Sequence, residues 1–171
     1  MIGRVAALSL ALLASAHAAT PANPPARGNC LAAAHRSLDF WVGEWTVFDK
    51  ANGGAQVGTS RIEAAMNGCG ISERYEAPNA PGGAYAGVSY SAFDRNDGKW
   101  HQFYVDVNGN ATWYTGAMRG KDMVMTAAGA NGMTQRMTYR PLADGSVEQI
   151  GESTADGKTW QPGYDYVYRK K

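Results

Sequence analysis

Short runs of aromatic and β-branched residues alternate with glycine-containing turns from Phe40 to the end of the chain. The turns contain pairs such as Asn108-Gly109 and Asp144-Gly145, which tolerate the positive φ that tight hairpins require. None of the runs has the i, i+3, i+4 spacing of a long amphipathic helix. Ten strands are predicted, at residues 44–49, 56–66, 71–77, 85–94, 99–107, 111–118, 123–127, 133–140, 146–153 and 164–169.

A meander of this length has to close on itself or leave an unprotected edge strand. The pattern therefore predicts an all-β fold, a single antiparallel up-and-down β-barrel of about eight to ten strands. The segment from Leu38 to Trp45 precedes the first strand and carries two tryptophans four residues apart. It is predicted to form a short helix or turn that plugs one end of the barrel.

Both faces of several predicted strands mix aromatic with polar residues. In 99–107, one face carries His101, Phe103 and Val105, and the opposite face carries Trp100, Gln102 and Tyr104. A solid hydrophobic core does not need polar groups on the inner face, whereas a barrel lumen that holds water or a ligand does. A slip of one residue in register would reverse every such assignment. We therefore expect a ligand-sized cavity, with a filled barrel as the alternative.

Residues 1–18 have the features of a secretory signal peptide: Arg4 near the start, an apolar stretch, and small residues before a cleavage site after Ala18. Residues 19–37 are predicted to form a proline-rich linker and a short helix, and residues 38–171 the barrel domain. The expected location is the periplasm or the exterior of the cell. The mature chain has two cysteines, Cys30 and Cys69, and an even pair in an oxidising compartment predicts a disulfide.

The charge of the chain is nearly balanced, with 16 basic and 15 acidic residues. Loss of Arg4 with the signal peptide leaves equal numbers, and the only basic run is the C-terminal Arg169-Lys170-Lys171. This composition argues against nucleic-acid and anionic-membrane partners. We expect a monomer without a stable membrane anchor.

The opening segment Leu38-Asp39-Phe40-Trp41-Val42-Gly43-Glu44-Trp45 resembles the signature of a bacterial family of exported, lipocalin-like proteins of unknown function. Later blocks of the family resemble further segments in the same order: Arg61-Ile62-Glu63, Asn67-Gly68-Cys69-Gly70, Trp100-His101-Gln102 with Val105-Asp106, Asp144-Gly145-Ser146-Val147 and Asp156-Gly157-Lys158-Thr159-Trp160. The resemblance implies a calycin-type antiparallel barrel with a Cys30–Cys69 pair, and it implies no established activity. Two positions depart from the family pattern, Thr138 in place of a tryptophan and Gly151 in place of a bulky residue, and both would enlarge or reshape a lumen if they faced inward.

A small-molecule site in a barrel combines aromatic walls with a few directed polar groups. The candidates for such a site are Trp100, His101, Gln102, Tyr104, Trp113, Arg136, Tyr139, Gln149 and Glu152. Arg136 is suited to a ligand carboxylate, with Gln149 and Glu152 fixing its orientation. The alternative is a structural ion pair between Arg136 and Glu152, capped by Gln149, with no ligand.

The interpretation favoured by the sequence is an exported binding protein that holds a small, partly apolar ligand in its lumen. One alternative is an isomerase or hydrolase with His101 as the base and Arg136 as the charge stabiliser. A second is a structural or inhibitory module with a filled barrel. No catalytic motif such as Gly-x-Ser-x-Gly or His-Glu-x-x-His occurs, so non-enzymatic binding is preferred. No metal or cofactor is expected, since the methionines are better explained as core residues than as Cu(I) ligands.

Overall fold

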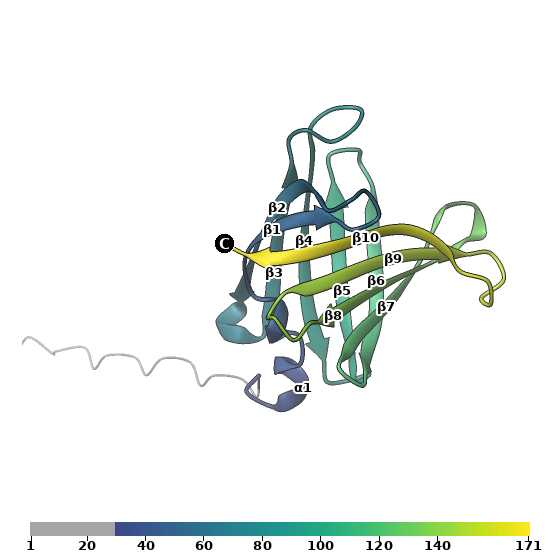
Figure 1. Ribbon diagram of the computed structural model, residues 1–171. Helices are drawn as coiled ribbons and strands as arrows, with labels where there is room; N and C mark the ends of the chain where they lie inside the picture. The colour runs from purple at the N-terminus through teal and green to yellow at the C-terminus, as the bar shows by residue number, and fades with distance from the viewer. Residues whose placement is uncertain (1–29) are drawn as a thin grey trace, which may run out of the picture.

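The computed structural model describes residues 30–171. The predicted signal peptide and the proline-rich part of the predicted linker lie outside these residues. Ten antiparallel strands form a closed up-and-down barrel (Figure 1), which confirms the predicted fold class. The strands are β1 (Gly43–Asp49), β2 (Ala55–Ala65), β3 (Gly70–Ala77), β4 (Tyr85–Asp94), β5 (Lys99–Asp106), β6 (Ala111–Arg119), β7 (Asp122–Ala128), β8 (Thr134–Pro141), β9 (Val147–Thr154) and β10 (Gln161–Lys170).

Each strand pairs with its neighbours in the chain, and the first strand pairs with the last. In the closing pair, Val47 of β1 lies opposite Tyr168 of β10. Glycine has positive φ at every predicted turn, as at Gly109 (81°) and Gly145 (82°). Strand β10 begins earlier than predicted, at Gln161, and its pairing with β9 shifts register between Pro162 and Tyr164. Proline has no N–H for the ladder, so it is accommodated beside this irregularity.

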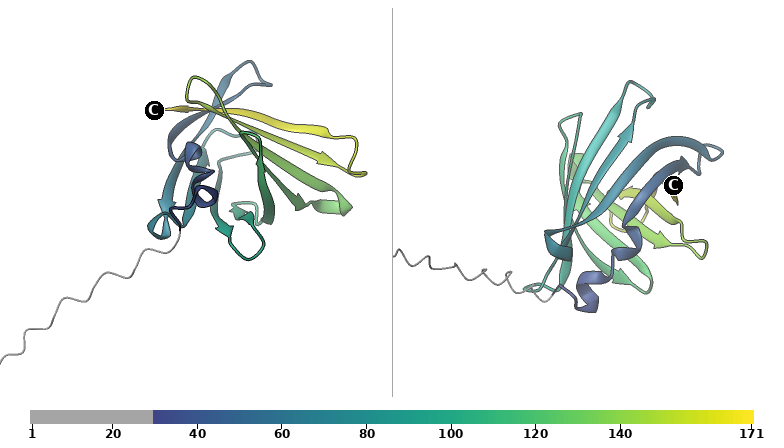
Figure 2. Two further views of the ribbon diagram at one scale, coloured as in Figure 1. Left: turned by 90° about the horizontal axis from the view of Figure 1, so that it is seen from below. Right: turned by 90° about the vertical axis from the view of Figure 1, so that its left-hand side faces the viewer.

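A short helix, α1 (Ala33–Arg36), and a 3-10 turn, η1 (Asp39–Trp41), precede β1. Figure 2 shows them at one end of the barrel, and the helix contacts β4. Two further 3-10 turns occur, η2 (Met66–Gly68) between β2 and β3 and η3 (Ala130–Gly132) between β7 and β8. None of the helices within residues 30–171 has the length and apolar character needed to cross a bilayer.

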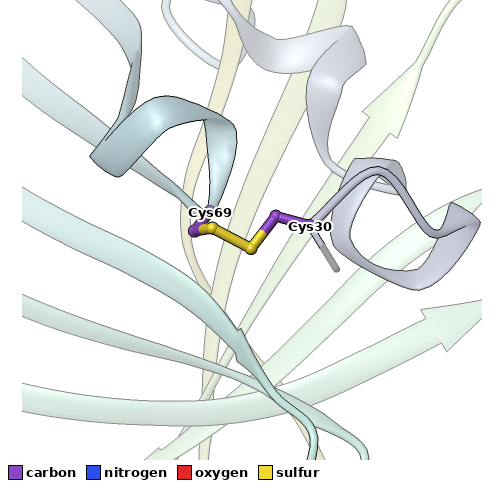
Figure 3. Close-up of a disulfide and its surroundings, with 2 residues drawn as sticks. All are labelled: Cys30 and Cys69. Carbon is purple, nitrogen blue, oxygen red and sulfur yellow. A yellow bond between two sulfur atoms is a disulfide. The ribbon is translucent and has the colours of Figure 1, made fainter. Parts of the chain in front are cut away.

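The predicted disulfide between Cys30 and Cys69 is present. It joins the segment before α1 to the residue that follows η2 (Figure 3). This link fixes the N-terminal segment against the β2–β3 connection. The disulfide is compatible with a location outside the cytoplasm.

Trp41 plugs the barrel, as the sequence predicted for this segment. Its side chain is fully buried, and its ring centroid lies 4.5 Å from that of Tyr139 and 6.4 Å from that of Tyr168. Trp45 is also fully buried, and its indole N–H donates a hydrogen bond of 2.9 Å to the carbonyl oxygen of Trp41. Leu38 completes this buried floor.

Candidate functional site

A cavity of about 1650 Å³ occupies the barrel above this floor. Its upper lining includes residues of the β1–β2, β3–β4, β5–β6 and β7–β8 connections, such as Asn52, Pro81, Asn108 and Gly129. These connections all lie at the end of the barrel opposite the N-terminal segment, because the strands run up and down. The lumen is therefore closed below by Trp41 and reached from the loop end.

Tyrosine dominates the wall of the lumen. Eight of the nine tyrosines of the chain line it: Tyr75, Tyr85, Tyr104, Tyr114, Tyr139, Tyr164, Tyr166 and Tyr168. Burial raises the pKa of Tyr114 and of Tyr166, so these phenols stay neutral at physiological pH. Aromatic rings with a hydroxyl provide apolar faces and hydrogen-bonding tips together.

Glycines make room for three of these rings. A Cβ atom at Gly87 would overlap the hydroxyl end of Tyr104, and one at Gly151 would overlap the ring of Tyr164. A Cβ atom at Gly58 would lie 2.8 Å from the hydroxyl oxygen of Tyr75. Gly151 therefore faces inward, and the ring of Tyr164 occupies the space beside it. Thr138 is not among the lumen residues, since it alternates along β8 with the inward-facing Met137 and Tyr139.

Several lumen tyrosines are held by hydrogen bonds between side chains. The hydroxyls of Tyr85 and Tyr104 lie 2.7 Å apart, and the Tyr85 hydroxyl donates to Asp106 at 3.1 Å. The Tyr114 hydroxyl donates to Oε1 of Gln135 at 3.0 Å. Such bonds fix the rings in place before any ligand arrives, which lowers the entropy cost of binding.

Two buried glutamines hold the deepest rings. Nε2 of Gln102 donates to the hydroxyl of Tyr139 at 3.2 Å and to Oγ of Ser91 at 3.1 Å. The Tyr168 hydroxyl donates to Oε1 of Gln149 at 2.6 Å. Gln102, Tyr104, Tyr139 and Gln149 therefore occupy inward-facing positions around the lumen.

Three of the predicted site residues do not line the lumen. Trp113 is 67% exposed on the outer face of β6, where it stacks on Phe103 with ring centroids 4.2 Å apart. Trp100 is buried at the closed end, and its indole N–H donates to Oγ of Ser37 at 3.0 Å. The expectation that these rings form lumen walls is wrong, because strand register and the position of the N-terminal segment could not be read from the sequence.

His101 also lies away from the lumen, on the face of β5 opposite Gln102. Its side chain is 37% exposed, and its Nε2 lies 2.9 Å from a carboxylate oxygen of Asp97 in the β4–β5 turn. The proposed catalytic pair of His101 and Arg136 is therefore not formed. The enzymatic alternative loses the only base that the sequence suggested for it.

Arg136 and Glu152 form the structural ion pair that the sequence left as an alternative. Nε and Nη2 of Arg136 donate to Oε2 of Glu152 at 2.9 and 2.7 Å, and the guanidinium lies 3.8 Å from the ring centroid of Trp160. Both residues border the cavity from outward-facing positions of β8 and β9. Gln149 does not cap the pair, since it bonds to Tyr168 inside the barrel.

The sequence analysis missed Glu73, which is 6% exposed and lines the lumen from β3. Oγ of Ser60 and Oγ of Ser89, on the two flanking strands, donate to its two carboxylate oxygens at 3.0 and 3.3 Å. Desolvation by burial raises its pKa to about 7, although these two hydrogen bonds act to lower it. A signal was present, because Glu73 shares one strand face with Ile71 and Tyr75, where a carboxylate is out of place.

Six lumen tyrosines were also missed: Tyr75, Tyr85, Tyr114, Tyr164, Tyr166 and Tyr168. The period-two spacing of Tyr164, Tyr166 and Tyr168 places three rings on one face of β10 and would have identified that face. The closed ten-stranded antiparallel barrel is consistent with a lipocalin-like fold. Comparisons of the chain with protein-family models and with curated proteins find no match.

Proposed function

We propose that the protein binds a small, partly apolar molecule non-covalently in the lumen of the barrel. The observation that carries this proposal is the tyrosine-lined cavity of about 1650 Å³, closed below and reached from the loop end. Its volume exceeds the several hundred Å³ that small-molecule sites typically need. Among the residues predicted from the sequence, Tyr104 and Gln149 would contact such a ligand, whereas Gln102 and Tyr139 are almost fully buried and bond to each other.

The arrangement of the lumen supports binding over a merely structural barrel. A filled barrel would pack its inner face with aliphatic side chains, whereas here hydroxyl and amide groups face an open volume. In the part of the chain that the structure describes, the hydroxyls of Tyr75, Tyr164 and Tyr166 have no hydrogen-bond partner of their own. They line the cavity and are free to bond a ligand or water.

The experiment titrates the protein with N-phenyl-1-naphthylamine, a neutral apolar fluorophore, and compares two variants of adjacent residues on β6. Tyr114→Ala removes a ring from the lumen, and Trp113→Ala removes one from the outer face. Loss of one aromatic contact should weaken binding about threefold to tenfold in Tyr114→Ala. Trp113→Ala should bind as the unmodified protein does.

Thermal unfolding of both variants checks that each is folded at the temperature of the titration. Absence of a fluorescence change with the unmodified protein would overturn the proposal. Loss of binding in Trp113→Ala, with Tyr114→Ala unaffected, would also overturn it, because the fluorophore would then occupy the outer face.

We also infer that the chain is an exported member of the lipocalin-like family that its Leu38–Trp45 segment resembles, acting as a monomer without a nucleic-acid partner. The disulfide between Cys30 and Cys69 supports export, since such bonds persist in oxidising compartments. The balanced charge supports the absence of a nucleic-acid partner. N-terminal sequencing of the mature protein tests the predicted cleavage after Ala18, and a chain that keeps residues 1–18 would contradict it.

A further inference from the structure

Two glutamates are buried within residues 30–171, and they differ in how their charge is neutralised. Glu148 lies on the outer face of β9, where Arg140 Nη1 is 3.0 Å from Oε2 and Lys50 bonds Oε1. Glu73 faces the lumen and has only the hydroxyls of Ser60 and Ser89 as partners. A buried carboxylate without a cation is costly, so a positive charge beside Glu73 would be favourable.

The wall of the lumen is unbalanced in charge. Three carboxylates occupy inward-facing positions beside it, those of Asp49, Glu73 and Asp106. Arg136 is the one basic residue that borders it in the described part of the chain, and it lies on the outer face of β8, where it is bound to Glu152. The field inside the cavity therefore favours a cation and opposes an anion. This reverses the role that the sequence suggested for Arg136 as the partner of a ligand carboxylate.

Five tyrosines interact electrostatically with Glu73. Burial is the main cause of the raised pKa of Tyr139 and of Tyr168, and the charge of Glu73 is the next largest cause. The same charge contributes to the raised pKa of Tyr75, Tyr104 and Tyr164. These five rings therefore lie within electrostatic range of the carboxylate. The faces of aromatic rings attract cations, so rings and carboxylate favour the same kind of group.

Each strand that faces Glu73 contributes only neutral groups at this depth. The neighbouring strands β2 and β4 present Ser60, Ile62, Ser89 and Ser91, and the strands across the lumen present Val47, Gln102, Tyr104, Tyr114, Met125, Met137, Tyr139, Gln149, Tyr164, Tyr166 and Tyr168. The other charged groups that line the cavity have their own partners. Asp49 accepts backbone N–H groups, and Asp106 bonds Tyr85 and Asn110.

We propose that the ligand is a small organic cation, an ammonium group on an apolar body, with the ammonium on Glu73 and the body against the tyrosine walls. This inference rests on the proposed function, since it names the class of ligand for the same lumen. The carboxylate supplies the charge, and each of its oxygens accepts only one hydroxyl donor, so it retains acceptor capacity for an N–H group.

The test uses two probes of nearly equal shape, naphthalen-2-ylmethanamine and naphthalen-2-ylmethanol, with isothermal titration calorimetry on the mature protein. The amine is positively charged near neutral pH and the alcohol is neutral. At pH 8 the unmodified protein should bind the amine at least tenfold more tightly than the alcohol. Glu73→Gln should remove this difference by weakening the binding of the amine.

Glu63→Gln is the matched control, because it removes the same charge from the outer face of β2, where Glu63 pairs with Arg61. This control should bind both probes as the unmodified protein does. The pH profile of the unmodified protein provides a second measurement that needs no variant. Below the pKa of Glu73, protons compete with the ammonium, so the affinity for the amine should fall up to tenfold for each pH unit while that for the alcohol stays level.

The outcomes separate this inference from the proposed function. Equal affinity for the two probes, unaffected by Glu73→Gln and by pH, would overturn the inference and leave lumen binding in place. Failure of both probes to bind would count against the lumen as a binding site, and the cation proposal would fall with it. A tenfold preference for the amine that persists in Glu73→Gln would overturn the assignment to Glu73.

Discussion

Replacement of Glu73 by glutamine should stabilise the protein at neutral and alkaline pH. The amide is nearly the same size as the carboxylate and can still bond both Ser60 and Ser89, because each hydroxyl can donate or accept. The change removes only the cost of ionising a carboxyl group that is 6% exposed. The protein therefore keeps its packing and loses an unfavourable charge.

The magnitude follows from the pKa of Glu73, which burial raises from 4.5 to about 7. Between these values the folded protein holds a proton that the unfolded chain has released, so stability falls as pH rises. Each unit of difference in pKa corresponds to about 1.4 kcal/mol. The free energy of unfolding therefore falls by about 3 kcal/mol as Glu73 ionises, and this fall is complete above pH 7. The free energy of unfolding of Glu73→Gln, taken relative to that of the unmodified protein, should therefore be about 3 kcal/mol higher at pH 8 than near pH 4.

Urea unfolding of both proteins at intervals from pH 4 to pH 8 measures this difference. Asp156 titrates in a separate range, since hydrogen bonds from the backbone of Thr159 and Lys158 lower its pKa to about 2. Its stabilising contribution is lost only as pH falls below about 4. Glu63→Gln should follow the unmodified protein throughout. Parallel curves for Glu73→Gln and the unmodified protein would refute the reasoning, since they would show that the carboxylate is not desolvated.

Two further predictions concern the scaffold of the lumen. Reduction of the Cys30–Cys69 disulfide, which spans 39 residues of sequence, should destabilise the protein by about 2–4 kcal/mol; thermal unfolding with and without dithiothreitol measures this, and an unchanged midpoint would contradict it. Gly116→Ala should destabilise the barrel by about 1–3 kcal/mol, because the new Cβ atom would overlap the backbone carbonyl oxygen of Val124. Urea unfolding compares this variant with Thr115→Ala, a substitution at the adjacent, outward-facing position. Equal stability of the two variants would contradict the predicted overlap between the Cβ atom at position 116 and the carbonyl oxygen of Val124.

Local chemistry made most of the fold predictable. Each hairpin turn required a residue that accepts positive φ, and glycines such as Gly98 and Gly120 have that conformation in the structure. All ten predicted strands are present, with ends that differ by a few residues. The disulfide was predictable because only two cysteines exist to form it.

The candidate site was predictable only in part, because inward and outward faces depend on register. Alternation along β5 separates Gln102 and Tyr104 from His101, and one strand considered alone does not show which set faces inward. Trp113 was assigned to the lumen for its ring, although it lies on the outside beside Phe103. The period-two spacing of Tyr164 and Tyr166 marks one face of β10, but only closure of the barrel shows that this face lies inside.

The sequence by itself determined the strands, their turns, their antiparallel order and the disulfide, since these depend on residues close together in the chain or on a single possible pairing. The tertiary structure alone decided which faces enclose the lumen and what charge it holds. Glu73 acquires its raised pKa because strands β2 and β4 surround it with hydroxyls and the closed barrel removes water from it. Burial of that kind is a property of the whole barrel, so no local pattern of residues expresses it.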